Sequence, residues 1–214
     1  MQGRRYSLLD RIVGEADKVL RTLAADTARP SRPSPAAGLP EAGLNDAERR
    51  QIAGFMRINH TGEVCAQALY QGQALTARLP VVREEMARAA REEVDHLAWC
   101  NERLAALDAP PSRLNPLWYA MSFGIGAVAG LAGDKWSLGF VAETEQQVCE
   151  HLQGHLASLP LNDQRTRAVL AQMHEDEAEH RDMALRAGAA ELPPPVKRAM
   201  RLMARVMTHT TYYI

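Results

Sequence analysis

Two short motifs in this chain place a carboxylate and an imidazole three residues apart: Glu93-Val-Asp-His96 and Glu177-Ala-Glu-His180. In a helix, residues at i and i+3 lie on one face about a turn apart, so both side chains of a motif can bind one ion. Carboxylates and imidazoles together favour iron or manganese over softer metals. Two lone glutamates, Glu63 and Glu145, each precede one motif along the chain. The pattern predicts a site for two metal ions.

Each of the four glutamates lies within an apolar stripe whose members recur every three or four residues, the spacing of one helix face. A carboxylate there must be protonated, paired or metal-bound, because burying it unpaired is costly. The stripes contain no lysine or arginine, whereas two divalent cations would balance four carboxylates. The stripes are Ile52, Phe55, Met56, Asn59, Glu63, Ala66 and Tyr70; Val82, Met86, Ala89, Glu93, His96, Cys100, Leu104 and Leu107; Leu138, Val141, Glu145, Val148 and Leu152; and Val169, Met173, Glu177, His180 and Ala184.

One glutamate from each of two helices and a Glu-x-x-His from each of two others is the ligand inventory of ferritin-like di-metal bundles. The sequence therefore predicts an all-α protein built on a ferritin-like four-helix bundle. Asn45 and Glu48 can form a capping box before the first helix, and Pro80 and Gly188 mark helix boundaries. The four helices are expected at about 45–78, 80–107, 134–158 and 162–187.

Further segments lie between and beside these four helices. Residues 117–132, LWYAMSFGIGAVAGLA, connect the second helix to the third and carry no charge. As a helix they would span ~24 Å, less than the ~30 Å of a bilayer core. We expect an apolar crossover helix that is either buried in the protein or dips into one leaflet. Gly126 and Gly130 are spaced for close helix packing. Residues 1–43 are expected to form an N-terminal amphipathic helix and a proline-rich linker, and residues 44–214 the main domain.

A second amphipathic helix is predicted at the C-terminus, after Pro193-Pro-Pro195. Such a basic helix suits either an anionic membrane surface or packing on the bundle, and both alternatives remain open. Its apolar face comprises Val196, Ala199, Met200, Met203, Val206, Met207 and Thr210, and its basic residues are Lys197, Arg198, Arg201 and Arg205.

Composition narrows the function classes. A formal net charge of −1 gives no global attraction to nucleic acid, so none is expected as a partner. The three cysteines form no CxxC pair, which argues against a disulfide framework or a structural zinc site. Acidic residues interrupt the first 25 residues and argue against a secretory signal or a mitochondrial transit peptide. We therefore expect the protein on the cytoplasmic side.

The segment Met56-Arg-Ile-Asn-His-Thr-Gly-Glu63-Val-Cys-Ala-Gln-Ala-Leu-Tyr-Gln-Gly-Gln73 closely resembles the demethoxyubiquinone hydroxylase family of ubiquinone biosynthesis. The resemblance continues through both Glu-x-x-His motifs, the apolar crossover and Val141-Ala-Glu-Thr-Glu145, and covers about residues 44–214. It implies two iron ions per chain. By this resemblance Glu63, Glu93 and His96 serve one iron and Glu145, Glu177 and His180 the other, with Glu93 and Glu177 bridging.

The resemblance also implies an O₂-dependent di-iron monooxygenase that hydroxylates the ring of demethoxyubiquinol, 2-polyprenyl-3-methyl-6-methoxy-1,4-benzoquinol. No GxGxxG motif follows a strand pattern, so an external electron donor is expected. The polyprenyl tail implies peripheral attachment to the cytoplasmic face of the cell membrane. Other proteins of ubiquinone biosynthesis are candidate partners.

Two sets of residues are assigned supporting roles. Tyr70, two turns after Glu63, is a candidate to reach the metal ligands through its hydroxyl, and the alternative is an ordinary core tyrosine. The crossover is the candidate wall of a slot that admits the polyprenyl substrate from the membrane. The residues expected to form this wall are Trp118, Phe123, Ile125 and Val128.

Two other functions share part of the pattern. A soluble ferritin-like iron-storage or peroxide-scavenging protein would use the same ligands, but it would not need the apolar segment 117–132. A non-enzymatic quinone-binding bundle would not need six metal ligands in order. Detergent dependence discriminates the first alternative from a hydroxylase, and metal content discriminates the second.

Overall fold

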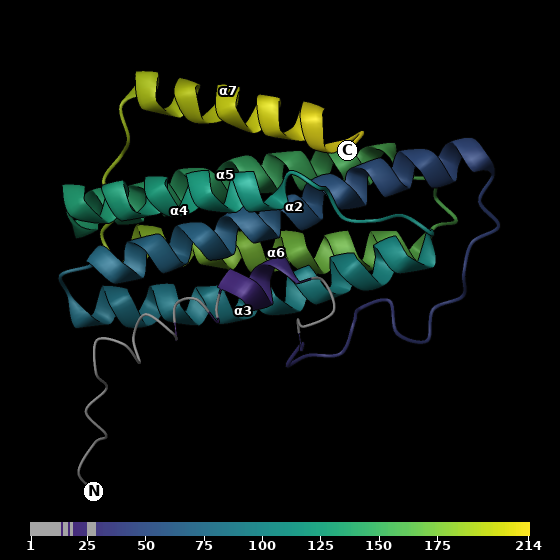
Figure 1. The fold of residues 1–214 in the computed structure, drawn as a ribbon, viewed down its shortest axis with the longest axis horizontal. Coiled ribbons are helices and arrows are strands. Elements are labelled where there is room, and N and C mark those ends of the chain that lie inside the picture. The colour runs from purple at the N-terminus through teal and green to yellow at the C-terminus, as the bar shows by residue number, and fades with distance from the viewer. Residues whose placement is uncertain (1–13, 15–16, 18, 25–28) are drawn as a thin grey trace, which may run out of the picture.

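A computed structural model describes residues 14, 17, 19–24 and 29–214, which form a bundle of long helices (Figure 1). Within these residues there is no β-strand, and the predicted all-α class is confirmed. The four predicted bundle helices begin and end close to the expected positions. The helices are α2 (Asp46–Thr76), α3 (Pro80–Ala106), α4 (Asn115–Ala132), α5 (Asp134–Ser158), α6 (Gln164–Arg186) and α7 (Pro194–Thr211).

Two helical hairpins make up the bundle: α2 packs against α3, and α5 packs against α6. Contacts between α3 and α6 join the hairpins. Two apolar clusters fill the interior. One is centred on residues such as Met56, Trp99 and Met173, and the other contains Met86 and Leu138. On every bundle helix the predicted glutamate lies between the two clusters in sequence, so the apolar core is interrupted midway by a polar layer.

Helix ends follow local sequence signals. Asn45 Oδ1 accepts hydrogen bonds from the Ala47 and Glu48 amides while the Glu48 carboxylate accepts from the Asn45 amide, which confirms the predicted capping box. At the start of α6, Asp163 accepts from the amide of Thr166 at 3.1 Å. Gly133, with φ of 114°, separates α4 from α5 in a conformation that other residues adopt only under strain.

The crossover helix α4 lies against α2 through glycines. A Cβ at Gly126 would overlap the carbonyl oxygen of Leu69, and one at Gly72 would overlap that of Phe123. This close approach confirms the packing role predicted for Gly126. Other residues of α4 are exposed, so the helix is not wholly buried in the protein, and its dipping into one leaflet stays a prediction. Its large exposed residues are Leu117, Met121, Val128 and Leu131.

No helix in the described part of the chain combines the length and apolarity that a membrane crossing requires.

Helix α7 stands apart from the bundle along most of its length (Figure 1). It is held mainly at its ends. Before its first turn, Ala190 donates a backbone hydrogen bond to Lys135 at 2.9 Å, and after its last turn the Arg57 guanidinium donates to the carbonyl of Tyr212. The predicted apolar face between these points is only partly covered, because Met200 and Met207 are half-buried whereas Val196, Met203 and Val206 are exposed. Both predicted alternatives, packing on the bundle and contact with a membrane surface, therefore stay open.

Most of the predicted N-terminal amphipathic helix, including its start near Ser7, lies outside the described residues. Residues 19–23 are helical, and Val19 and Leu23 pack against a small apolar cluster that includes Val64. Leu20, between them in sequence, is exposed. The proline-rich residues 29–44 contain no helix and are fastened to α3 and α6.

Candidate metal centre

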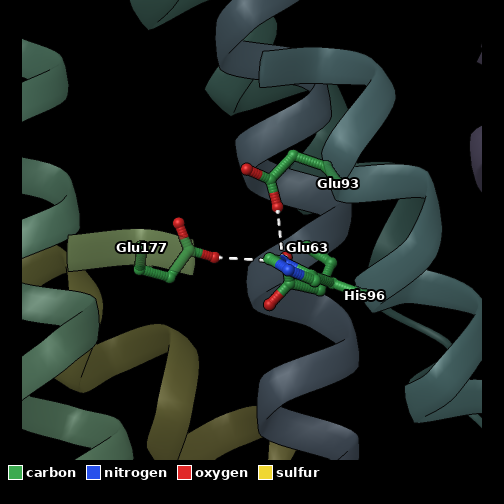
Figure 2. A group of neighbouring side chains, drawn as sticks. All are labelled: Glu63, Glu93, His96 and Glu177. Carbon is green, nitrogen blue, oxygen red and sulfur yellow. Dashed lines mark hydrogen bonds and ion pairs between the residues drawn. The ribbon is translucent and has the colours of Figure 1, made fainter. Parts of the chain in front are cut away.

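Four of the predicted ligands meet in the polar layer between the apolar clusters (Figure 2). Glu63 comes from α2, Glu93 and His96 from α3, and Glu177 from α6. One ligand atom from each lies within 4.8 Å of the others, and all four side chains are buried. Residues 114 positions apart in sequence thus converge because each occupies the middle of an inward helix face.

The carboxylates of Glu93 and Glu177 lie between the two imidazoles of the motifs. His96 Nδ1 is 3.1 Å from Glu93 and 3.2 Å from Glu177. His180 Nδ1 is 3.1 Å from Glu177 and 3.3 Å from Glu93. Glu63, by contrast, approaches only His96, at 3.5 Å. The two motif glutamates therefore lie close to both imidazoles, whereas Glu63 lies close to that of His96. The bridging role predicted for Glu93 and Glu177 stays a prediction.

Glu145 of α5 belongs to the same layer on the side of His180. Its Oε1 accepts a hydrogen bond of 2.5 Å from the Tyr70 hydroxyl, and both residues are fully buried. The Tyr70 ring in turn meets the His180 ring edge-on, with centroids 6.4 Å apart. The structure thus brings all six sequence-predicted ligands and Tyr70 into one region, although Glu145 is outside the tightest group of four.

The outward nitrogens of the two histidines are also bonded to carboxylates. His96 Nε2 lies 2.8 Å from Asp176, and His180 Nε2 lies 2.6 Å from Glu92. Asp176 directly precedes the glutamate of the second motif, and Glu92 directly precedes that of the first. Each motif therefore supplies the carboxylate that orients the histidine of the other. Such partners fix the histidine tautomer so that the inner nitrogen can bind a metal.

The buried carboxylates of this layer repel one another, and added positive charge would stabilise them. Burial and the charge of Glu93 raise the pKa of Glu63 well above its usual range, and burial with Glu177 and Glu93 does the same for Glu145. Burial alone would lower the pKa of His180, but hydrogen bonds to Glu177 and Glu93 outweigh it and raise the pKa to about 12. Protons thus neutralise the cluster when no cation does.

The donor set fits two divalent cations. The four buried glutamates form no ion pair with a lysine or arginine among the described residues, and their recorded cationic partners are the two histidines. Glu93 Oε1 is buried without a hydrogen-bond partner in the described structure, and its ion pair with His180 at 3.3 Å is long. Cations at the inner nitrogens would replace the protons and satisfy this oxygen.

A polar cavity of about 300 Å³ opens beside the cluster between α3 and α6. His180, Glu92 and Asp176 line its inner end, and Arg88 and Arg186 lie among its other residues. Its walls carry charged groups of both signs, so water and small polar molecules suit it better than a polyprenyl chain.

The residues predicted to wall a substrate slot do not share one environment. Trp118 is buried, whereas Val128 on the same helix is 67% exposed. Phe123 stacks beside Tyr119 in the cluster that receives Val19 and Leu23. None of the four lines the polar cavity. The slot remains a prediction.

Sequence reasoning missed the outer carboxylates and their partner Arg32. Glu92, Asp95 and Asp176 resemble ordinary charged helix positions, and Arg32 belongs to a segment with no periodicity. One signal was available: in both motifs an acidic residue stands directly before the ligand glutamate, as Glu92-Glu93 and Asp176-Glu177. That repetition marks a second pair of carboxylates with a shared role.

Comparison with known proteins gives a consistent assignment. The family model described as ubiquinone biosynthesis protein COQ7 matches residues 50–211. The chain is 58% identical over 211 residues to the 3-demethoxyubiquinol 3-hydroxylases of Pseudomonas putida (strain GB-1) and Azotobacter vinelandii, and 57% identical to that of Pseudomonas aeruginosa (strain LESB58). Each alignment covers 99% of this chain and 98% of the relative.

Proposed function

Because this chain belongs to the family of ubiquinone biosynthesis protein COQ7, we propose that it is a monooxygenase that hydroxylates the ring of demethoxyubiquinol with O₂. The observation that carries the proposal is the buried pair of crossed Glu-x-x-His motifs, in which two carboxylates lie between two imidazoles. Neither an iron store nor a quinone-binding bundle accounts for this centre together with relatives that match over nearly the whole chain.

Iron is the metal that best fits the ligands and the proposed reaction. Glu63, Glu93 and His96 would hold one ion and Glu145, Glu177 and His180 the other. Bound Fe(II) would supply the electrons that reduce O₂, with one oxygen atom entering the ring and the other leaving as water. An external donor would have to restore these electrons.

The side chains around the ligands have three tasks. The Tyr70 hydroxyl holds one oxygen of Glu145, which leaves the other oxygen for the metal. Asp176 and Glu92 hold the histidines with their inner nitrogens directed at the cluster. The apolar clusters on either side exclude bulk water from the ring and from the reacting oxygen.

The function can be tested by single-turnover oxygen labelling. Protein loaded anaerobically with Fe(II) should bind about two irons per chain and, on exposure to ¹⁸O₂ with demethoxyubiquinol, should yield a quinol that carries one labelled oxygen in its new hydroxyl. Mass spectrometry of the extracted product gives the answer. A fully loaded protein that forms no product, or product with unlabelled oxygen, would rule the reaction out.

We further propose that α7 and the exposed face of α4 attach the protein peripherally to the cytoplasmic face of the cell membrane. A polyprenyl substrate partitions into lipid, so an enzyme acting on it needs a membrane-facing surface. Helix α7 offers exposed Leu202, Met203 and Val206, with Arg198 and Arg205 exposed on the same helix. Apolar insertion and attraction to anionic headgroups would act together there.

The basic residues of α7 divide into two matched pairs that test this attachment. Lys197 and Arg201 lie 3.3 and 3.6 Å from the carboxylate of Glu143, whereas Arg198 and Arg205 are exposed and form no ion pair within the described structure. Replacing Arg198 and Arg205 by glutamine should weaken binding to anionic vesicles by about tenfold or more, since each basic residue near such a surface contributes ~1 kcal/mol.

The paired substitution of Lys197 and Arg201 should affect vesicle binding less, because those charges are already compensated by Glu143. Vesicle co-sedimentation at low and high salt measures both variants, and the difference should shrink at high salt. Equal losses in the two variants, or wild-type protein that stays in the supernatant with every vesicle, would contradict the attachment.

A further inference from the structure

The segment Ser31–Arg32 lies before the part of the chain that matches the family model, yet it contacts the metal centre's supporting residues. Arg32 Nε is 2.8 Å from Asp95, and one of its terminal nitrogens is 2.8 Å from Asp176. The guanidinium also lies over the Trp99 ring, 4.9 Å from its centroid. One side chain from the proline-rich segment therefore bridges α3 and α6.

Asp95 depends on this segment. It is 1% exposed, directly precedes His96, and points away from the metal cluster. Within the described structure its recorded hydrogen bonds come from the Ser31 amide at 2.6 Å, the Ser31 hydroxyl and Arg32. Loss of these contacts would leave a buried carboxylate without a partner beside a metal ligand, which is strongly unfavourable.

Asp176 links the segment to the ligand itself. The same oxygen that accepts from His96 Nε2 at 2.8 Å also accepts from Arg32 at 2.8 Å, while the other oxygen accepts from Gln172 at 3.0 Å. Three donors on two helices and the segment thus fix this carboxylate. Rotation of the His96 imidazole would break its hydrogen bond to Asp176, and the hydrogen bond from Arg32 holds Asp176 in the position that makes this bond.

The second histidine is held differently. Glu92, the partner of His180 Nε2, has a side chain that is 36% exposed, and its recorded cationic neighbour Arg88 is 3.6 Å away on the same helix. No residue of the segment is bonded to it in the described structure. The two motifs are therefore arranged nearly symmetrically at their glutamates and histidines. The carboxylates behind the histidines differ, because among the described residues Asp176 is bonded to the segment Ser31–Arg32 and Glu92 is not.

We propose that Arg32 is a positioning residue for the metal centre: through Asp176 and Asp95 it fixes His96, so that the ion bound by His96 is held more firmly than the ion bound by His180. The inference rests on the proposed di-iron centre. It assigns to the proline-rich segment a part in building the site, beyond joining the N-terminal helix to the bundle.

The test measures iron release and iron environment without substrate or O₂. Wild-type protein loaded with Fe(II) should lose one iron faster than the other to an excess of chelator. In Arg32→Ala the slow phase should accelerate about tenfold, the lower end of the range for losing an outer partner of a metal ligand. The Mössbauer spectrum should change in one of two ferrous doublets. Arg32→Lys keeps the charge but cannot span both carboxylates, so its slow release rate should lie between those of wild type and Arg32→Ala.

A matched control separates this role from general loosening of the segment. Arg165 pairs with Glu41 at 2.9 Å, further along the same segment, and Arg165→Ala should leave release and spectrum unchanged. In an Asp176→Asn background, Arg32→Ala should have a smaller effect than in the wild-type background, because the two changes share the Arg32–Asp176 linkage and only the Arg32–Asp95 linkage is left to lose. Circular dichroism should show that each variant remains helical.

The proposal is overturned if Arg32→Ala matches wild type in release and spectrum, if Arg165→Ala has the same effect, or if the Arg32 and Asp176 changes add fully. Wild-type protein that binds no iron would remove the proposed di-iron function, and this inference with it. If wild-type protein binds two irons and every variant releases its iron at the wild-type rates, the positioning role alone is refuted.

Discussion

Protein carrying Glu177→Ala should bind less than the wild-type amount of iron and should lose hydroxylation by more than about a hundredfold, since removal of even outer partners of metal ligands costs 10- to 100-fold. The reason is the position of this carboxylate, 3.2 Å from His96 and 3.1 Å from His180. No other residue of α6 can replace it between the imidazoles. Iron analysis and single-turnover product formation measure both effects.

The helices should persist in this variant. Burial, together with the charges of Glu177 and Glu93, raises the pKa of Glu145, and removing buried Glu177 relieves one of these repulsions. Far-ultraviolet circular dichroism of metal-free protein should therefore remain close to wild type. Glu175→Ala is the matched control, because Glu175 is exposed on the same helix, and its iron content and turnover should not change. Wild-type turnover in Glu177→Ala would refute the assignment of the centre.

Gly126→Ala should destabilise the fold, with no direct effect on the ligands. The new methyl would overlap the carbonyl oxygen of Leu69 in α2, and backbone atoms cannot turn aside as a side chain can. Overpacking of this kind costs about 1–3 kcal/mol, or more where no rearrangement relieves it. For a chain of this size each kcal/mol lowers the melting temperature by roughly 2–4 °C.

Gly124→Ala should stabilise the fold, in contrast to Gly126→Ala. Gly124 lies on the same helix, two residues away, and a Cβ there meets nothing within 4 Å. Alanine is favoured over glycine in a helix by about 0.8–1.0 kcal/mol, so the melting temperature should rise slightly. The melting temperatures of the two metal-free variants, measured by thermal unfolding and compared with that of wild type, test both expectations. Equal shifts would mean that α4 does not pack on α2 through its glycines.

The sequence predicted the helices well because their signals are local. The capping box at Asn45 and Glu48, and the positive-φ glycines Gly133 and Gly188, act within a turn of the boundaries that they set. The apolar stripes predicted which face of each helix turns inward, and that suffices to bring Glu63, Glu93, His96 and Glu177 together. The predicted ranges therefore needed little correction.

What could not be predicted depends on contacts between distant segments. Arg32 reaches Asp176 across 144 positions, and no periodic pattern marks a residue in an irregular segment. The pairing of Glu143 with Lys197 joins α5 to a helix whose placement over the bundle no stripe specified. The apolar face of α7 was ambiguous for the same reason, because an amphipathic pattern shows that a face exists without showing what covers it.

The exchange of carboxylates between the motifs also bears on biosynthesis at the ribosome. His96 and Asp176 lie 80 residues apart, and Glu92 and His180 lie 88 apart. At ~5–20 residues per second, roughly 4–18 s pass between the synthesis of a residue of the first motif and the synthesis of its partner in the second motif. During that time neither motif has its orienting carboxylate, and α5 and α6 do not yet enclose the polar layer. The crossed contacts can therefore form only after the second hairpin has been synthesised, and the proposed metal ions would have to be delivered after that point.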